Sequence, residues 1–145
     1  MNSFVLDCSV ALAWLHEDGD PAYVEGTFRL LEGGATAFAP PIWYYEMVNG
    51  LVMAQRRKRA SAARISEFLE ALNEYAVQIF MPDWKNVTAA LGHDAKAASG
   101  NNLTAYDNAY LLTALQLGLP LASLDCDLIR AARKAGIEDA VKNWS

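Results

Sequence analysis

The chain has 145 residues, of which 53% are hydrophobic and 20% charged, and its formal net charge is −5. This composition excludes a disordered protein, and the length predicts one globular domain, residues 1–145, with a full hydrophobic core. The longest apolar stretch, residues 110–124, contains Gln116, Gly118 and Pro120 and is too broken to span a membrane. No basic leader precedes the first apolar run, so we expect a cytoplasmic protein with reduced thiols.

The first half of the chain alternates short apolar runs with helical patterns. Pro21 suits the first turn of a helix, Pro40 and Pro41 open a long one, and Ser61 is placed to cap another. In that last helix, Ile65, Phe68, Leu69 and Leu72 are spaced to form one apolar face. The expected elements are a strand at 4–6, helices at 10–16 and from 21 to about 33, a strand at 36–39, a helix at 42–59 and the helix after Ser61.

The second half continues the alternation. We expect a strand at 77–80, a helix at 83–98 that a Gly-Asn-Asn break at 100–102 follows, a helix at 105–117, a strand at 121–124, a helix at 128–134 and a final edge strand at 140–141. Strands that alternate with helices predict a three-layer α/β/α domain with a central, mainly parallel sheet.

The tripeptide Leu-Asp-Cys occurs twice, at residues 6–8 and 124–126, and each copy ends a short apolar run. Such runs are typical of buried parallel strands, and open α/β sheets bind their ligands at the carboxyl ends of the strands. If the two strands are neighbours, Asp7 and Asp125 share a pocket, and a divalent cation would relieve their repulsion. We interpret Cys8 and Cys126 as small buried residues rather than ligands or nucleophiles.

Two further carboxylates have unusual surroundings. Glu46 lies among apolar neighbours in a predicted helix, where a glutamate is rarely buried without a partner, although it could also face solvent. Asp107 follows Thr104 at the spacing of a capping box, and Asp7 and Asp125 could likewise be simple helix caps. Taken together, four oxygen ligands without clustered His or Cys predict Mg²⁺ or Mn²⁺ rather than zinc.

Basic residues are concentrated in one short segment. Five of the twelve lie between positions 56 and 64: Arg56, Arg57, Lys58, Arg59 and Arg64. They form either a solvated helix end, where cations complement the helix dipole, or a patch that binds phosphates. The net charge argues only weakly against a nucleic-acid partner.

Four segments resemble, in order and spacing, the motifs of the PIN domain family. They are residues 4–9 (Phe-Val-Leu-Asp-Cys-Ser), 41–49 (Pro-Ile-Trp-Tyr-Tyr-Glu-Met-Val-Asn), 103–110 (Leu-Thr-Ala-Tyr-Asp-Asn-Ala-Tyr) and 119–128 (Leu-Pro-Leu-Ala-Ser-Leu-Asp-Cys-Asp-Leu). The resemblance covers essentially the whole chain, and within the family the chain is most similar to the VapC-type toxins of bacterial toxin–antitoxin pairs.

This resemblance implies a metal-dependent ribonuclease with Mg²⁺ or Mn²⁺ as cofactor. Asp7, Glu46, Asp107 and Asp125 would hold the metal and carry catalysis. Ser9, Asn49 and Thr104 would orient those carboxylates. Asp127 is a looser candidate, since its negative charge also suits the first turn of the last helix. The basic segment from Arg56 to Arg64 would bind the RNA backbone.

The resemblance also implies a homodimer and a small VapB-like antitoxin as partner. Three other functions remain open at this point: a PIN nuclease of RNA processing or decay outside a toxin pair, a PIN-like domain that binds RNA or a partner without cleaving, and a phosphoacceptor receiver domain. Receiver chemistry needs a lysine near the last strands, and residues 119–124 contain none, so we rank it lowest.

Overall fold

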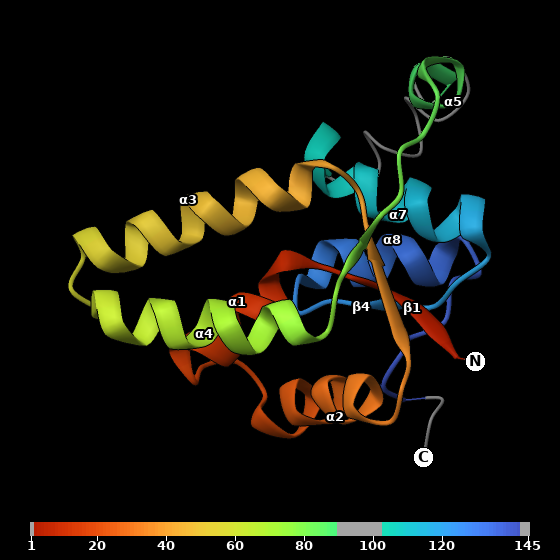
Figure 1. Ribbon diagram of the computed structural model, residues 1–145. Helices are drawn as coiled ribbons and strands as arrows, with labels where there is room; N and C mark the ends of the chain where they lie inside the picture. Colours follow the sequence, from red (N-terminus) through yellow and green to blue (C-terminus); the bar gives the residue numbers. More distant parts are fainter. Residues whose placement is uncertain (1, 90–102, 143–145) are drawn as a thin grey trace.

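The computed structural model describes residues 2–89 and 103–142. Its elements follow the expected alternation of strands and helices along the chain (Figure 1). They are β1 (Ser3–Leu6), α1 (Cys8–His16), α2 (Pro21–Glu32), β2 (Thr36–Ala39), α3 (Ile42–Arg56), α4 (Ala62–Glu74), β3 (Gln78–Ile79), α5 (Trp84–Ala89), α7 (Ala105–Leu117), β4 (Leu121–Ala122) and α8 (Cys126–Lys134).

The four strands form one parallel sheet in the order β3-β2-β1-β4. Strand β1 is central, and its residues Phe4, Val5 and Leu6 are fully buried. It pairs with β2 on one side and with β4 on the other. The predicted parallel sheet is therefore confirmed, and the two strands that precede the Leu-Asp-Cys tripeptides are neighbours.

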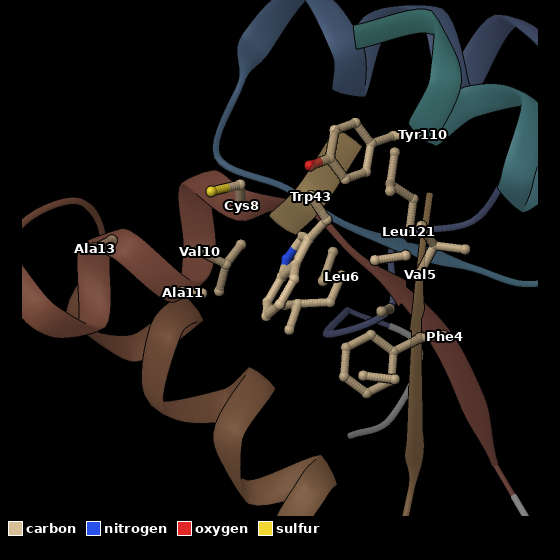
Figure 2. Packing of buried hydrophobic residues seen from close by; sticks show 14 of the residues in the cluster. Phe4, Val5, Leu6, Cys8, Val10, Ala11, Ala13, Trp43, Tyr110 and Leu121 are labelled. Atoms are coloured by element: carbon tan, nitrogen blue, oxygen red, sulfur yellow. The ribbon is translucent and has the colours of Figure 1, made fainter. Parts of the chain in front are cut away.

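Helices cover both faces of the sheet and complete the three-layer α/β/α arrangement. Helices α1, α2 and α4 lie on one side, and α7 and α8 lie on the other (Figure 1). Aromatic contacts join the first group, because Trp14 of α1 packs against Phe28 of α2 and Phe68 of α4. On the other side, α7 contacts both β1 and β4. Figure 2 shows the core around β1, with Phe4 at one end and Cys8 and Tyr110 at the other.

Several boundaries differ from those predicted. Helix α3 ends at Arg56, three residues early, because Lys58 adopts a left-handed φ of 55° that starts the turn into α4. Strand β4 stops at Ala122, two residues before the end of its apolar run. Helices α1 and α8 each begin directly after an aspartate, at Cys8 and Cys126.

Three other expectations are corrected or fall outside the description. In α4, Phe68 and Leu72 are buried, but Leu69 is 37% exposed and does not join the apolar face. The edge strand predicted at 140–141 is a single parallel bridge between Leu121 and Asp139. Of the helix predicted at 83–98, α5 covers the first part, and residues 90–98 lie outside the described residues, as does the break at 100–102.

Candidate active site

The register of β1 and β4 decides how the two Leu-Asp-Cys tripeptides relate. Leu6 pairs with Ala122, so Asp7 lies level with Ser123, and Asp125 lies two residues further along the chain. The backbone N–H of Asp7 donates to the carbonyl of Ala122 at 2.9 Å. The tripeptides are thus not equivalent in space, and the prediction that both cysteines are buried is wrong for Cys126, which is exposed while Cys8 is buried.

Asp7 occupies the N-cap position of α1, yet its side chain makes no capping hydrogen bond. It is only 6% exposed, and its Oδ2 accepts 2.7 Å hydrogen bonds from the hydroxyls of Ser9 and Ser123. The ordinary explanation of Asp7 as a helix cap is therefore wrong. Two hydroxyls instead hold this carboxylate at the carboxyl end of the central strand, the edge at which open α/β sheets bind their ligands.

The same two serines also bind the chain beyond β4. Ser9 Oγ accepts the N–H of Leu124, and Ser123 Oγ accepts the N–H of Asp125, both at 3.0 Å. Each hydroxyl therefore donates to Asp7 and accepts from the segment that carries Asp125. This arrangement sets the position of one aspartate relative to the other.

Asp125 does act as a helix cap. Its Oδ1 accepts the N–H groups of Asp127 and Leu128, at 2.9 and 3.0 Å, and so begins α8. Asp127 forms an ion pair at 2.9 Å with Arg130, one turn on, as its place in the first turn of α8 suggests. The local explanation holds for Asp125, but a cap at one carboxylate oxygen does not exclude a second role at the other.

Glu46 is half-buried on α3, and its Oε1 accepts a 2.8 Å hydrogen bond from the hydroxyl of Tyr110 on α7. Tyr110 itself is fully buried. Helix α3 also packs very closely on α1, because a Cβ added to Gly50 would lie 2.5 Å from Leu12 Cδ1. These two contacts fix Glu46 on the side of α3 that faces α7, and none of the described residues forms an ion pair with it.

Thr104 and Asp107 form the complete capping box that their spacing predicts. Asp107 N–H donates to Thr104 Oγ1 at 3.1 Å, and the Thr104 hydroxyl donates to Asp107 Oδ2 at 2.9 Å. Asp107 thereby begins the helix on which Tyr110 lies one turn later. The local explanation also holds for this pair, which places the carboxylate at the amino end of α7.

The four carboxylates influence one another electrostatically. Burial raises the pKa of Asp7, the hydrogen bonds from Ser123 and Ser9 act in the opposite direction, and the charges of Asp125 and Asp107 add to the rise. Burial also raises the pKa of Glu46, against the hydrogen bond from Tyr110 and together with the charges of Asp7 and Asp107. The fold therefore brings the four acids of the four sequence motifs into one negative region.

This region suits a divalent cation by its donor chemistry, since hard carboxylate oxygens in mutual repulsion are the ligands of Mg²⁺ and Mn²⁺. Within residues 2–89 and 103–142, however, no three acidic, His or Cys side chains converge closely enough to hold an ion as they lie. Each carboxylate instead accepts hydrogen bonds from hydroxyls or backbone N–H groups. In each case these bonds engage one oxygen of the carboxylate: Oδ2 of Asp7, Oε1 of Glu46, Oδ2 of Asp107 and Oδ1 of Asp125.

The remaining candidates lie further along α3, on the turn after it and in the first turn of α4. Asn49 is exposed one turn beyond Glu46, and Arg56 and Arg57 are exposed at the end of α3. Arg59 pairs with Asp18 at 2.9 Å, and Arg64 with Glu67 at 3.8 Å. At 1.5 Å per helical residue, Arg56 is about 15 Å from Glu46 along the axis of α3. The basic segment therefore lies beside the acidic region rather than within it.

Sequence reasoning missed three residues of the site: Ser123, Tyr110 and Tyr23. Tyr23 Oη accepts the N–H of Ser123 at 3.2 Å and donates to Asp139 at 3.0 Å, and so ties α2 to the end of β4. A signal for Ser123 was available, since it is the one polar residue of the apolar run 119–124. Tyr110 lies one helical turn after Asp107, but nothing local predicts that its hydroxyl reaches Glu46.

An apolar groove of about 710 Å³ lies near the start of α7, between α5 and the beginning of α3. Met81 and Trp84, which line it, are 71% and 78% exposed.

No helix of the described residues is long and apolar enough to cross a membrane.

The chain was compared with protein-family models and with curated proteins. The sequence model of a family described as PIN domain matches residues 4–134, which contain all four carboxylates and the described strands except the first residue of β1. No curated protein matches the chain significantly.

Proposed function

Because the chain belongs to the PIN domain family, whose members are generally nucleases, we propose that it is a metal-dependent endoribonuclease that hydrolyses RNA phosphodiester bonds. The observation that carries the proposal is the buried Asp7, held by Ser9 and Ser123 at the end of the central strand in the field of Asp107 and Asp125. Burial among like charges destabilises a carboxylate that has only a structural role. In a carboxylate that binds a cation, the cation offsets this repulsion.

In this proposal Asp7, Glu46, Asp107 and Asp125 hold Mg²⁺ or Mn²⁺. When bound, such an ion activates water for in-line attack on phosphate and stabilises the developing charge. Ser9 and Ser123 fix the orientation of the Asp7 carboxylate, and Tyr110 fixes that of Glu46. Because these side chains are already ordered, little further ordering is needed when the ion binds. Thr104 orients Asp107 in the same way. No side chain of the site is needed as a covalent nucleophile, and the proposed products carry a 5′-phosphate and a 3′-hydroxyl.

The test is cleavage of a labelled RNA by the purified chain with Mg²⁺ or Mn²⁺, compared with Asp7→Asn and Asp107→Asn. Both variants should lose cleavage while their circular dichroism spectra stay unchanged. Glu46→Gln should also lose cleavage. The matched control is Glu70→Gln, a change at an exposed position on α4, which should cleave normally. Unchanged cleavage by Asp7→Asn and Asp107→Asn would disprove the assignment.

We also propose that the protein is the toxin of a VapBC-like pair and acts in the cytoplasm as a homodimer inhibited by a VapB-like antitoxin. The resemblance of all four motifs supports the toxin, and the exposed Met81 and Trp84 of the apolar groove support burial against another protein chain. Growth arrest on expression, relieved by Asp7→Asn and by co-expression of a small neighbouring gene, is the expected result. Cleavage in vitro without growth arrest would favour a nuclease of RNA processing or decay.

A further inference from the structure

Tyr23 joins two parts of the chain that lie far from it in sequence. It is half-buried in the first turn of α2, and its hydroxyl donates to Asp139 Oδ1 at 3.0 Å. The oxygen of the same hydroxyl accepts the backbone N–H of Ser123 at 3.2 Å. A single side chain therefore connects helix α2, the end of β4 and the segment that follows α8.

Asp139 is held beside β4 by its own backbone. It forms a parallel bridge with Leu121, the first residue of that strand. Besides the Tyr23 hydroxyl, Asp139 Oδ1 accepts the N–H groups of Val141 at 2.9 Å and of Lys142 at 3.4 Å. These three hydrogen bonds engage one oxygen, and an asparagine would offer the same acceptor without the charge.

Helix α2 lies close against this last segment. A Cβ added to Gly26, one turn after Tyr23, would lie 2.9 Å from Val141 Cγ1. Burial raises the pKa of Tyr23, and the charge of Asp139 adds to the rise. The hydroxyl therefore stays protonated, so it can donate to the carboxylate while it accepts the N–H of Ser123.

Ser123 connects this contact to the acidic region. Its hydroxyl donates to Asp7 Oδ2 at 2.7 Å, and its Oγ accepts the N–H of Asp125 at 3.0 Å. Strand β4 ends at Ala122, so Ser123 lies just beyond the regular pairing of the sheet. Ser123 is only 1% exposed, and its own N–H has the Tyr23 hydroxyl as partner. The position of the serine thus depends on a contact from outside the sheet.

We propose that Tyr23 is a positioning residue of the metal site, which acts through Ser123 on Asp7 and Asp125. Asp139 orients the Tyr23 hydroxyl. This inference rests on the proposed function and adds to it a support that reaches the site from α2 and from the end of the chain. Asp139 lies outside residues 4–134, the part of the chain that the family model matches.

Removal of the Tyr23 hydroxyl would leave a buried backbone N–H without its acceptor. A buried donor without a partner is unfavourable, so Ser123 would move to find another one. Its hydroxyl would then hold Asp7 less firmly relative to Asp125. Carboxylates that are less well oriented bind a cation more weakly, so the expected loss is in metal affinity.

The test measures Mn²⁺ binding by isothermal titration calorimetry, without RNA, at a temperature at which circular dichroism shows every variant folded. Tyr23→Phe should weaken Mn²⁺ binding about 10-fold, the low end of the range for residues that orient metal ligands. Asp139→Ala should weaken it as well, whereas Asp139→Asn, which keeps the acceptor, should restore the affinity. Tyr75→Phe is the matched control, a half-buried tyrosine whose ring packs against Trp14 and Phe28, and should bind as the unchanged protein does.

A double variant tests whether Tyr23 acts through Ser123. If it does, Tyr23→Phe combined with Ser123→Ala should lose less Mn²⁺ affinity than the product of the two single losses. In cleavage assays Tyr23→Phe should require more Mn²⁺ while its KM for RNA stays unchanged, because the proposed role is in metal binding.

Equal Mn²⁺ affinity of Tyr23→Phe and the unchanged protein would overturn the inference, even if the variant melted at a lower temperature, because Tyr23 would then serve the fold alone. Single losses that multiply in the double variant would overturn it too, as would absence of Mn²⁺ binding by the unchanged protein. Failure of the nuclease proposal is a separate result: the unchanged protein would then bind Mn²⁺ but cleave no RNA.

Discussion

The hydroxyl of Ser123 donates a 2.7 Å hydrogen bond to Oδ2 of Asp7, a residue 116 positions earlier in the sequence. The Oγ of Ser123 also accepts the N–H of Asp125. Both partners are buried, with Ser123 only 1% exposed. One small hydroxyl therefore connects the ends of the two neighbouring strands that carry the aspartates. The arrangement depends on the register in which Leu6 pairs with Ala122.

We expect Ser123→Ala to lower RNA cleavage about 10- to 100-fold, the usual range for residues that orient metal ligands. The change removes one of two donors to Asp7 and leaves the N–H of Asp125 without its acceptor. Cleavage rates measured over a range of Mn²⁺ concentrations should show that more metal is needed. Ser66→Ala, on the exposed side of α4, is the control, and an equal rate for the two variants would show that Ser123 has no such role.

Tyr110→Phe should reduce cleavage about 10-fold while the fold is retained. The ring keeps its packing, but Glu46 loses the hydrogen bond that opposes the effect of burial on its pKa, so that pKa rises further. The pH profile of cleavage should therefore shift to higher pH on its acidic side. A profile identical to that of the unchanged protein would show that Tyr110 serves packing alone.

Asp7→Asn should raise the melting temperature of the metal-free protein at neutral pH by a few degrees while it abolishes cleavage. Burial raises the pKa of Asp7 above its ordinary value of 3.8. Between that value and the folded pKa, the folded protein therefore binds more protons than the unfolded chain. Its stability therefore falls as pH rises from about 3.8 through the folded pKa. Asparagine carries no charge, and its oxygen still accepts from the two serines.

The measurement is thermal unfolding of both proteins in chelator from acidic to neutral pH. The difference in melting temperature should be smallest near pH 4 and grow towards neutrality, and saturating Mn²⁺ should reverse it by stabilising only the unchanged protein. Glu70→Gln should show no such growth. A constant difference at all pH values would contradict the prediction.

Gly50→Val should destabilise the protein by about 1–3 kcal/mol, because the added carbon atoms meet Leu12 where α3 packs on α1. Cleavage should fall as well, since Glu46 lies one turn before Gly50. Chemical denaturation gives the first quantity, and activity at a temperature where the variant is still folded gives the second. Gln55→Val, an exposed change on the same helix, should alter neither.

The sequence by itself determined the order of the elements, and it singled out the four carboxylates that we propose as metal ligands. Local features account for this success: apolar runs of strand length end at Asp7 and before Asp125, Thr104 and Asp107 have capping-box spacing, and Pro21 and Ser61 begin helices as expected. These signals act within a few residues of chain and do not depend on the rest of the fold.

Only the tertiary structure decided which of those residues meet and what each one does. The sequence allowed Asp7 to be a cap, and it treated the two Leu-Asp-Cys tripeptides alike. The pairing of β1 with β4 sets Asp7 beside Ser123 instead, buries Cys8 and leaves Cys126 exposed. Likewise, contact of α7 with α3 brings Tyr110 to Glu46. Register and helix packing are set by long-range burial of the whole core, which no local pattern encodes.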